Sequence, residues 1–424
     1  MIVSDPGRAR REPRRNSFRP AGGSSPLVPS AAGTGAQRPR RAPQRLRRGP
    51  VAAAGRRPAP SRYYAKDVSA LLPQGADTRS SRRHRRYALR GILWRESRIE
   101  RVRKCGRVPA GSDGIAVIIS GGVAHYRGLV TCGSVWGCTC CAPKILNIRA
   151  QEISTAVGEW VKNGGACYMV TLTMPHDAGM RLRKLLPVIA NGWRAVLGGR
   201  PWTRLRRSLG IVGQIRSVEV THGLNGWHPH LHVLLVANAE FDARGLVDLD
   251  AHITAKWNSF IIKAGYRPPS GEHGVKIVRC WSAAEAGLYI AKTDDGKSVG
   301  NEMARGDLKE GRKQHRTPFE ILADFAATGD AEDLELWHEY ELATRGHQRI
   351  TWSKGLRQIM QAGPERTDEE IAAEEIGGDV TVMIPVALWR QITWIPGLPA
   401  AVLDAAESGG HDAIQHLVSR FGCG

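Results

Sequence analysis

The stretch GWHPHLHVLLV, residues 226–236, is the feature around which the rest of the chain can be interpreted. His228, His230 and His232 stand at alternate positions and lead into an apolar run. Because successive side chains of a β-strand point to opposite faces, the histidines would share one face and Leu231 would lie on the other. Imidazoles on one face can converge on a divalent ion. The alternative is a half-exposed strand that carries histidines by chance, and three in register argue against it.

A second strand is predicted at residues 215–221, joined to the first by a turn at residues 222–226. Alternation places Ser217, Glu219 and Thr221 on one face, which should be the face of the histidines. Glu219 is the carboxylate of that set, and a carboxylate beside two or three imidazoles suits Mg²⁺ or Mn²⁺. A solvated strand glutamate is the alternative.

Charge points to a polyanionic partner. The chain has 424 residues, 42% of them hydrophobic, with a formal charge of +21 and a pI near 10.1. Residues 1–60 hold 14 Arg and only two acidic residues. This balance favours nucleic acid over a membrane surface. No run of about 20 apolar residues and no apolar leader is present, so we expect a cytoplasmic protein without a membrane span.

Composition and periodicity divide the chain into four parts. Residues 1–88 are rich in Arg, Pro, Gly, Ala and Ser and are expected to be disordered, either as a nonspecific phosphate-binding segment or as an extension without a role. Residues 89–166 form a Cys-rich segment with a helix, residues 167–360 the main α+β domain, and residues 365–424 a small accessory region. The elements predicted in the middle parts are helices at 144–162, 180–197 and 248–263, and strands at 167–173 and 274–280.

Five of the eight cysteines lie between residues 105 and 141. In a chain without an export signal, such clustering indicates metal ligands more than disulfides. Cys138 and Cys141 form a CxxC pair, and Cys105 with Cys132 would complete a Cys₄ site for structural Zn²⁺ in a zinc-ribbon-like segment. Cys140 is then surplus. Buried reduced cysteines and a redox CxxC are the alternatives.

A short helix is predicted at residues 282–292. Glu285, Tyr289 and Lys292 recur at a spacing of four and three residues, so they share one helical face. Ser282 and Glu285 also fit a capping box. A structural interpretation therefore exists, in which Glu285 caps, Tyr289 packs and Lys292 is solvated.

Together these motifs resemble the HUH endonucleases, and more closely the rolling-circle replication initiators of small bacterial plasmids. The similarity runs in order through VTLTMPH at 170–176, Glu219 with HPHLH at 228–232, and the Glu285 to Lys292 block. The cysteine block and residues 352–357 are similar to features of actinobacterial members. The resemblance covers roughly residues 85–360 and implies an HUH-type central antiparallel sheet flanked by helices.

The resemblance also implies roles. His230 and His232 would bind the divalent ion, with Glu219 completing the site and His228 a fourth ligand or a phosphate contact. Tyr289 would be the nucleophile. Glu285 would activate water for the terminating cleavage, and Lys292 would stabilise phosphate or phenolate. The family often has Lys directly before the tyrosine, where this chain has Leu288.

The expected function is therefore metal-dependent nicking of single-stranded or hairpin plasmid-origin DNA, giving a 5′-phosphotyrosine and a 3′-OH primer, with termination and strand joining. Host helicase and polymerase are the expected partners. A transposase or conjugative relaxase of the same superfamily, or a non-catalytic DNA-binding protein with structural zinc, are the alternatives. Some tryptophans among basic residues would be able to stack bases, although most should be core: Trp193, Trp202, Trp227, Trp257 and Trp281.

Overall fold

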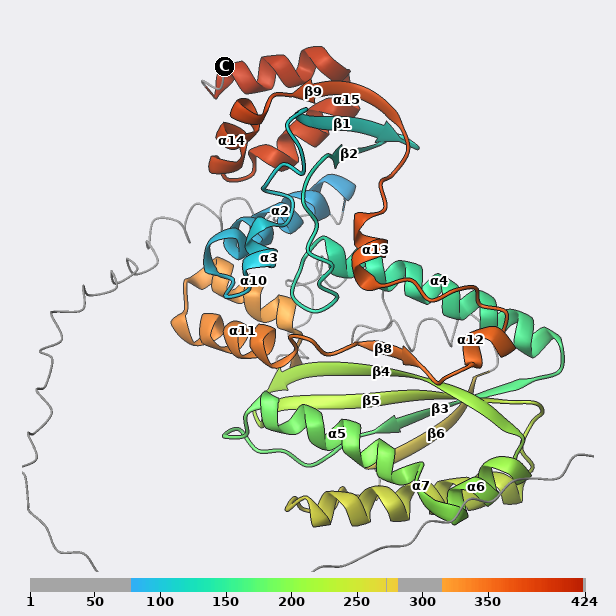
Figure 1. Cartoon of the computed structure of the whole chain (residues 1–424). Helices are drawn as coiled ribbons and strands as arrows, with labels where there is room; N and C mark the ends of the chain where they lie inside the picture. Colours follow the sequence, from blue (N-terminus) through green and yellow to red (C-terminus); the bar gives the residue numbers. More distant parts are fainter. Residues whose placement is uncertain (1–77, 272, 281–314, 422–424) are drawn as a thin grey trace, which may run out of the picture. The chain divides into compact units, whose positions relative to one another are not determined.

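A computed structural model describes residues 78–271, 273–280 and 315–421 (Figure 1). Contacts divide the chain into two units, Met1–Arg57 and Pro58–Gly424, and every described residue belongs to the second. Helix α2 (Arg79–Glu96) crosses the boundary expected at residue 88, so the helical structure begins earlier than the sequence indicated. Among the described residues, no helix is long and apolar enough to cross a membrane.

The predicted α+β class is confirmed, with an antiparallel sheet as its largest part. The strand order is β6-β3-β5-β4-β7, and β8 also pairs with β4. A two-residue connection joins β4 to β5, and the hairpin stays in register from the turn to the pair of Gly213 and Val236, beyond which the register shifts. The strands are β3 (Ala166–Leu172), β4 (Ile211–Gly223), β5 (Gly226–Ala237), β6 (Val275–Cys280), β7 (His315–Arg316) and β8 (Ile350–Trp352).

Helices cover both faces of this sheet (Figure 1). Leu231, Val233 and Leu235 of β5 share a core with helices α5 (Leu182–Val196) and α7 (Ala243–Lys263). Leu234 and Val236 pack with α4 (Cys141–Lys162) and α12 (Leu356–Ile359). The three histidines of β5 are even-numbered as well, so alternation places them on the α4 and α12 side.

The tryptophans considered for base stacking are core residues wherever the structure describes them. Trp193 and Trp257 are fully buried between α5, α7 and the sheet, and their indole N–H groups donate to Gln214 Oε1 and the Thr173 carbonyl. A buried indole needs such an acceptor. Trp202 and Trp227 are also buried, and Trp281 lies outside the described residues.

A second, three-stranded sheet joins two strands from the early part of the described chain to one strand from its late part. Its order is β2-β1-β9, with β1 (Ile115–Ser120), β2 (Val123–Arg127) and β9 (Asp379–Ile384). Helices α14 (Val386–Trp394) and α15 (Leu398–Arg420) pack on it. Strands from the Cys-rich segment and from the C-terminal region thus share one sheet, and sequence periodicity did not anticipate this pairing.

Trp389 of α14 is the centre of that second core. Its ring lies edge-on to Tyr126 with centroids 4.6 Å apart, and its N–H donates to the Arg107 carbonyl at 2.9 Å. The C-terminal region is therefore packed into the fold by a buried aromatic residue rather than attached through its linker alone.

Ion pairs join α2 to α15. Arg83 pairs with both Asp404 and Glu407, while Ser80 and His84 each contact Asp404 Oδ2 at 2.7 Å. Burial would raise the pKa of Asp404, but hydrogen bonds from His84 and Ser80 and the charge on Arg83 together lower it to about 2.

The remaining helices lie around these two sheets. Helix α11 (Ala331–Ala343) packs against α5 and α10 (Pro318–Thr328), and its Trp337 is fully buried. The helices are α3 (Glu100–Lys104), α6 (Gly199–Ser208), α10 (Pro318–Thr328), α11 (Ala331–Ala343) and α13 (Asp368–Ala373).

Candidate functional site

The β4–β5 hairpin aligns the histidines with the polar set of β4. Glu219 lies directly across from His230, Ser217 across from His232, and Thr221 is the partner of His228. Cross-strand partners on one face have their Cβ atoms about 5 Å apart. The register therefore places Glu219 and the three imidazoles on the same face of the sheet, as strand alternation predicted.

Two of these side chains already contact each other. His232 Nε2 lies 2.8 Å from Glu219 Oε2, where the imidazole N–H donates to the carboxylate. On the other side of the ring, the Thr171 hydroxyl lies within hydrogen-bond distance of His232 Nδ1, at 3.2 Å. Thr171 comes from β3, so both neighbouring strands orient the same imidazole.

The site also contains buried polar atoms without a partner. Glu219 Oε1 and His230 Nδ1 are buried and make no hydrogen bond within the part of the chain that the structure describes. A buried carboxylate oxygen or ring nitrogen left unpaired carries a desolvation penalty of about 1–3 kcal/mol. Such atoms are where a cation or a ligand would restore the lost interaction.

Burial keeps two of the imidazoles neutral. Desolvation, with a smaller contribution from His176 and His315, lowers the pKa of His228 to about 3. Desolvation also lowers the pKa of His230 well below its usual value. A neutral imidazole has a free lone pair, which is the form that ligates metals.

The cluster is larger than the sequence predicted. His176, just beyond β3, places Nε2 at 3.1 Å from His228 Nδ1, and the His315 ring of β7 lies 5.9 Å from that of His228. The sequence did contain an indication that His176 belongs to the cluster. It follows Met174-Pro175 at the end of a strand that lies next to the histidine strand. His315 had no local signal, because its proximity depends on β7 pairing with β4.

Three expected residues cannot be placed. Glu285, Tyr289 and Lys292 lie outside the described residues. The preceding strand β6 starts level with the histidines, since Thr171 is the partner of both His232 and Lys276.

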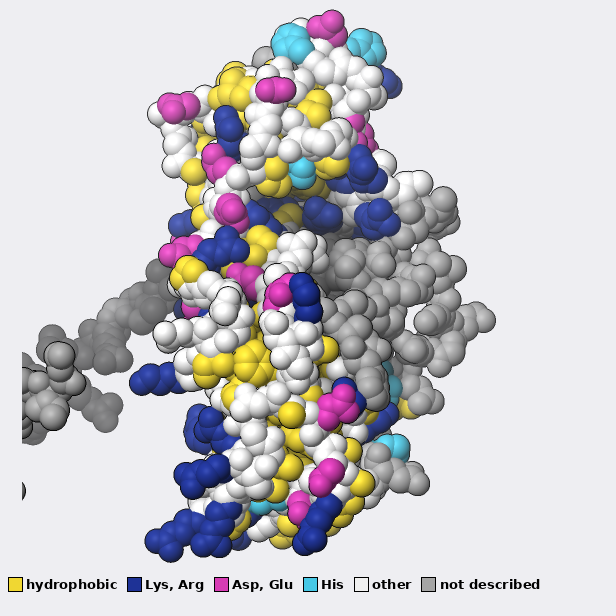
Figure 2. Space-filling model, turned by 90° about the vertical axis from the view of Figure 1, so that its right-hand side faces the viewer, with side chains coloured by type: hydrophobic (Ala, Val, Ile, Leu, Met, Phe, Trp, Pro, Cys, Tyr) yellow, Lys and Arg dark blue, Asp and Glu magenta, His cyan; other side chains and the backbone are white. Residues whose placement is uncertain are grey.

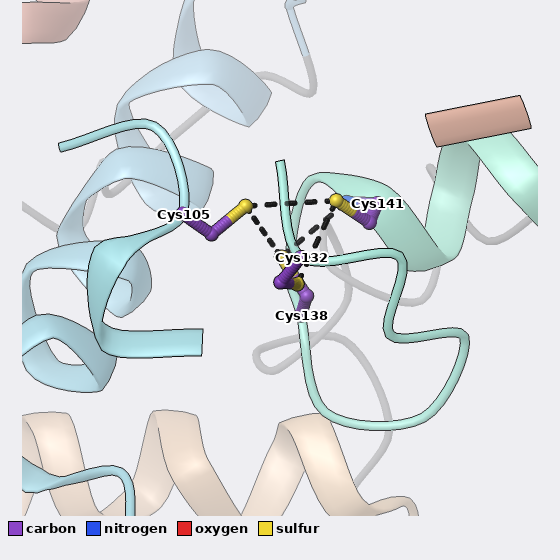
Figure 3. Close-up of side chains that lie close together, drawn as sticks. All are labelled: Cys105, Cys132, Cys138 and Cys141. Carbon is purple, nitrogen blue, oxygen red and sulfur yellow. Dashed lines mark hydrogen bonds between the residues drawn. The ribbon is translucent and has the colours of Figure 1, made fainter. Parts of the chain in front are cut away.

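The four predicted zinc ligands do converge (Figure 3). Cys105 follows α3, Cys132 lies in the loop after β2, and Cys138 and Cys141 stand at the start of α4. All four are buried. Their sulfur atoms lie within 4.8 Å of one another, with separations of 3.6 Å for Cys105–Cys138, 3.6 Å for Cys105–Cys141 and 3.7 Å for Cys132–Cys141.

These separations fit a tetrahedral ion rather than a disulfide. Four sulfurs about 2.3 Å from a central zinc lie about 3.8 Å apart, whereas a disulfide bond is about 2.05 Å long. Hydrogen bonds from the other three thiols, with help from the Arg90 charge, lower the pKa of Cys105. The four cysteines can therefore hold a metal ion such as zinc. Among the described residues, these four cysteines form the one group of potential metal ligands whose ligand atoms all lie within 4.8 Å of one another. The ligand atoms of the histidine cluster are further apart.

Two glycines shape the cysteine cluster. Gly106 and Gly133 each follow a ligand cysteine and have positive φ values of 55° and 60°, a conformation that a Cβ disfavours. A Cβ on Gly106 would also lie 1.8 Å from the Arg90 guanidinium, which donates to Cys105 Sγ at 3.4 Å. The fifth cysteine, Cys140, stands outside the cluster.

Comparison with known proteins gives two relatives. "Protein rep" of Streptomyces lividans is 33% identical over 338 residues, which cover 64% of this chain and 74% of the relative. A "Neomycin resistance protein" of Streptomyces cyanogenus is 28% identical over 293 residues, 53% of this chain and 67% of the relative. No family model matches the chain, and no solved structure matches it. By the extent of the first match, the chain belongs to the family of the Streptomyces lividans Rep protein.

Proposed function

We propose that this protein initiates plasmid rolling-circle replication by nicking and rejoining origin DNA as an HUH endonuclease. Membership of the Rep family supports the replication role, because that relative's name denotes it. The observation that carries the chemistry is Glu219 lying across the hairpin from His230, with His228 and His232 on the same face. A strongly basic chain suits a DNA substrate. Cytoplasmic localisation, with host helicase and polymerase as partners, follows from that role.

We assign His230, His232 and Glu219 to a Mg²⁺ or Mn²⁺ ion, with His228 as a fourth ligand or phosphate contact. Glu219 Oε1 and His230 Nδ1, which have no hydrogen-bond partner among the described residues, fit this assignment, as does the buried, neutral state of the His230 imidazole. Such an ion, when bound, neutralises phosphate charge and orients the phosphodiester. The protein's own contribution is orientation, since Thr171 fixes the His232 ring from the opposite side.

Tyr289 is assigned as the nucleophile. Its oxygen would attack the phosphorus as the P–O3′ bond breaks, which leaves a 5′-phosphotyrosine and a free 3′-OH. Tyrosine has an ordinary pKa near 10, so Lys292 would favour the phenolate. Glu285 would act as general base for water in the terminating cleavage.

Zn²⁺ in the Cys₄ cluster is assigned a structural role. All four ligands are protein thiols and buried, which leaves no open coordination position for a substrate. The cluster ties α3, the loop after β2 and α4 together.

The test is a nicking assay with Mn²⁺ on labelled single-stranded oligonucleotides that tile the DNA beside the gene. We expect a covalent adduct at the 5′ end of one product, lost in Tyr289→Phe. His230→Ala should lose nicking, whereas His416→Ala on the exposed face of α15 should retain it. Glu285→Ala should make the first nick and fail in termination. An adduct that persists in Tyr289→Phe would refute the nucleophile, and full activity in His230→Ala would refute the metal site.

A further inference from the structure

A basic surface on α5 and α6 stands apart from the histidine site. Between Asp177 and Glu219 the chain has nine Lys and Arg residues and no acidic residue. Six of these basic side chains are exposed and form no ion pair with any described carboxylate: Arg183, Lys184, Arg194, Arg200, Arg204 and Arg207. Figure 2 shows Lys and Arg side chains gathered along the lower-left edge, at the height of α5 and α6 in Figure 1.

Helix α6 presents its arginines in one direction. Arg200, Arg204 and Arg207 follow the i, i+4, i+7 spacing of a single helical face. The opposite face is packed, because Trp202 is buried and stacks on His252 of α7 at 5.6 Å. Because the apolar side of α6 is packed against α7, its three arginines point toward solvent. Their positive charges lie close together, and none of the described carboxylates pairs with them.

The fourth arginine of α6 has a different role. Arg206 donates to the carbonyls of Ile211 and Val212, both at 3.0 Å, and so joins α6 to the start of β4. This fixes the position of the stripe relative to the sheet that carries the histidines.

From these contacts we infer that the α5–α6 surface binds the phosphates of duplex DNA beside the nicking site. The stripe from Arg200 to Arg207 is about 10 Å long, which spans about three base-pair steps of one strand. Glu219 lies eight residues into β4 from Ile211, about 26 Å away along the strand. Because the histidines lie on the other face of the sheet from α5 and α7, a duplex that reaches α6 would have to pass the end of the sheet, and its flanking length would be at least about eight base pairs.

Duplex DNA fits this surface better than a single strand or a membrane. Proteins that bind single strands stack bases on exposed aromatic rings, and Trp193 and Trp202, the aromatic residues of α5 and α6, are buried. Membrane-surface helices insert an apolar face, and no large hydrophobic side chain described on α5 or α6 is exposed. This inference depends on the proposed function only for the choice of DNA as the polyanion.

The test compares salt dependence of binding to a labelled duplex of about 20 base pairs, without added divalent ion. The test variant carries Arg200→Gln, Arg204→Gln and Arg207→Gln. A matched control carries Arg345→Gln, Arg390→Gln and Arg420→Gln, three exposed arginines elsewhere with the same charge change. Circular dichroism and urea unfolding check that both variants fold.

We expect the test variant to bind more weakly, with a plot of log K against log salt about 2.7 shallower, because each lost phosphate contact removes about 0.9 from the slope. The control should keep the wild-type slope. An unchanged slope in the test variant overturns the inference, and so does an equal loss in the control, which would reflect net charge alone. This assay measures binding and not nicking, so it is independent of the nicking assay. If the wild-type protein does not nick DNA but the test variant has a shallower salt dependence of binding, the proposed surface is still supported.

Discussion

The Cys₄ cluster allows a prediction with an internal control, because one of the cysteines in the Cys138-Thr139-Cys140-Cys141 stretch lies outside it. Cys138→Ser removes a thiolate whose sulfur lies 3.6 Å from Cys105 Sγ. Cys140→Ser makes the same chemical change two residues away. We expect the first variant to lose zinc and the second to retain it.

The expected size of the effect is large. Structural zinc in four-ligand sites contributes about 10–16 kcal/mol of apparent binding free energy, and a whole domain is stable by only about 5–15 kcal/mol. Even a fraction of that loss would unfold the segment that the cluster closes. Three elements separated in sequence supply the ligands, so without the ion they would be held together only by their packing.

The assay is metal content of the purified, reduced protein, followed by urea unfolding with and without a chelator. Wild type and Cys140→Ser should hold about one zinc per chain. Cys138→Ser should hold almost none and unfold at lower urea, and chelation should bring wild type toward the same midpoint. A wild-type chain without zinc would refute the reasoning. Loss of zinc in Cys140→Ser would refute the assignment of the four ligands.

Three further predictions concern the fold. Trp389→Ala should destabilise the protein by about 3–5 kcal/mol in urea unfolding, because it empties the second core. Trp389→Phe should cost less, because it keeps a buried aromatic ring and loses the N–H donor to Arg107 and part of the ring volume. Asp404 has its pKa lowered on folding to about 2, so its ionised form stabilises the fold above a pH of about 4, and this stabilisation is lost as the pH falls toward 2. Asp404→Asn should flatten the pH dependence of the unfolding midpoint in that range, and an unchanged profile would contradict the ion-pair account. Gly106→Ala should cost about 1–3 kcal/mol in the same assay, because a Cβ is strained at φ 55° and would also meet the Arg90 guanidinium, and a neutral effect would contradict this account.

Periodicity predicted the hairpin well, because a strand's alternation is a local property. The side-chain period of two sorted Glu219 and the histidines onto one face, and a short turn left one register that buries Leu231 and Leu235. The same logic was weaker at α6, a helix that the sequence did not predict. Its apolar face consists of Trp202 and the partly buried Leu205, too few apolar positions to stand out from the surrounding arginines.

Residue type and spacing alone predicted three features of this protein. These are the strand face that carries the histidines, the carboxylate of Glu219 on that same face, and four cysteines that could bind one metal ion. The tertiary structure decided which distant residues join them. It placed His176 against His228, brought Cys105 and Cys132 to the CxxC pair, and buried the tryptophans considered for base stacking. It also paired β1 with β9, across most of the chain. The physical reason is that alternation and helical spacing act over a few residues, whereas burial and strand pairing between distant segments depend on the packing of the whole fold.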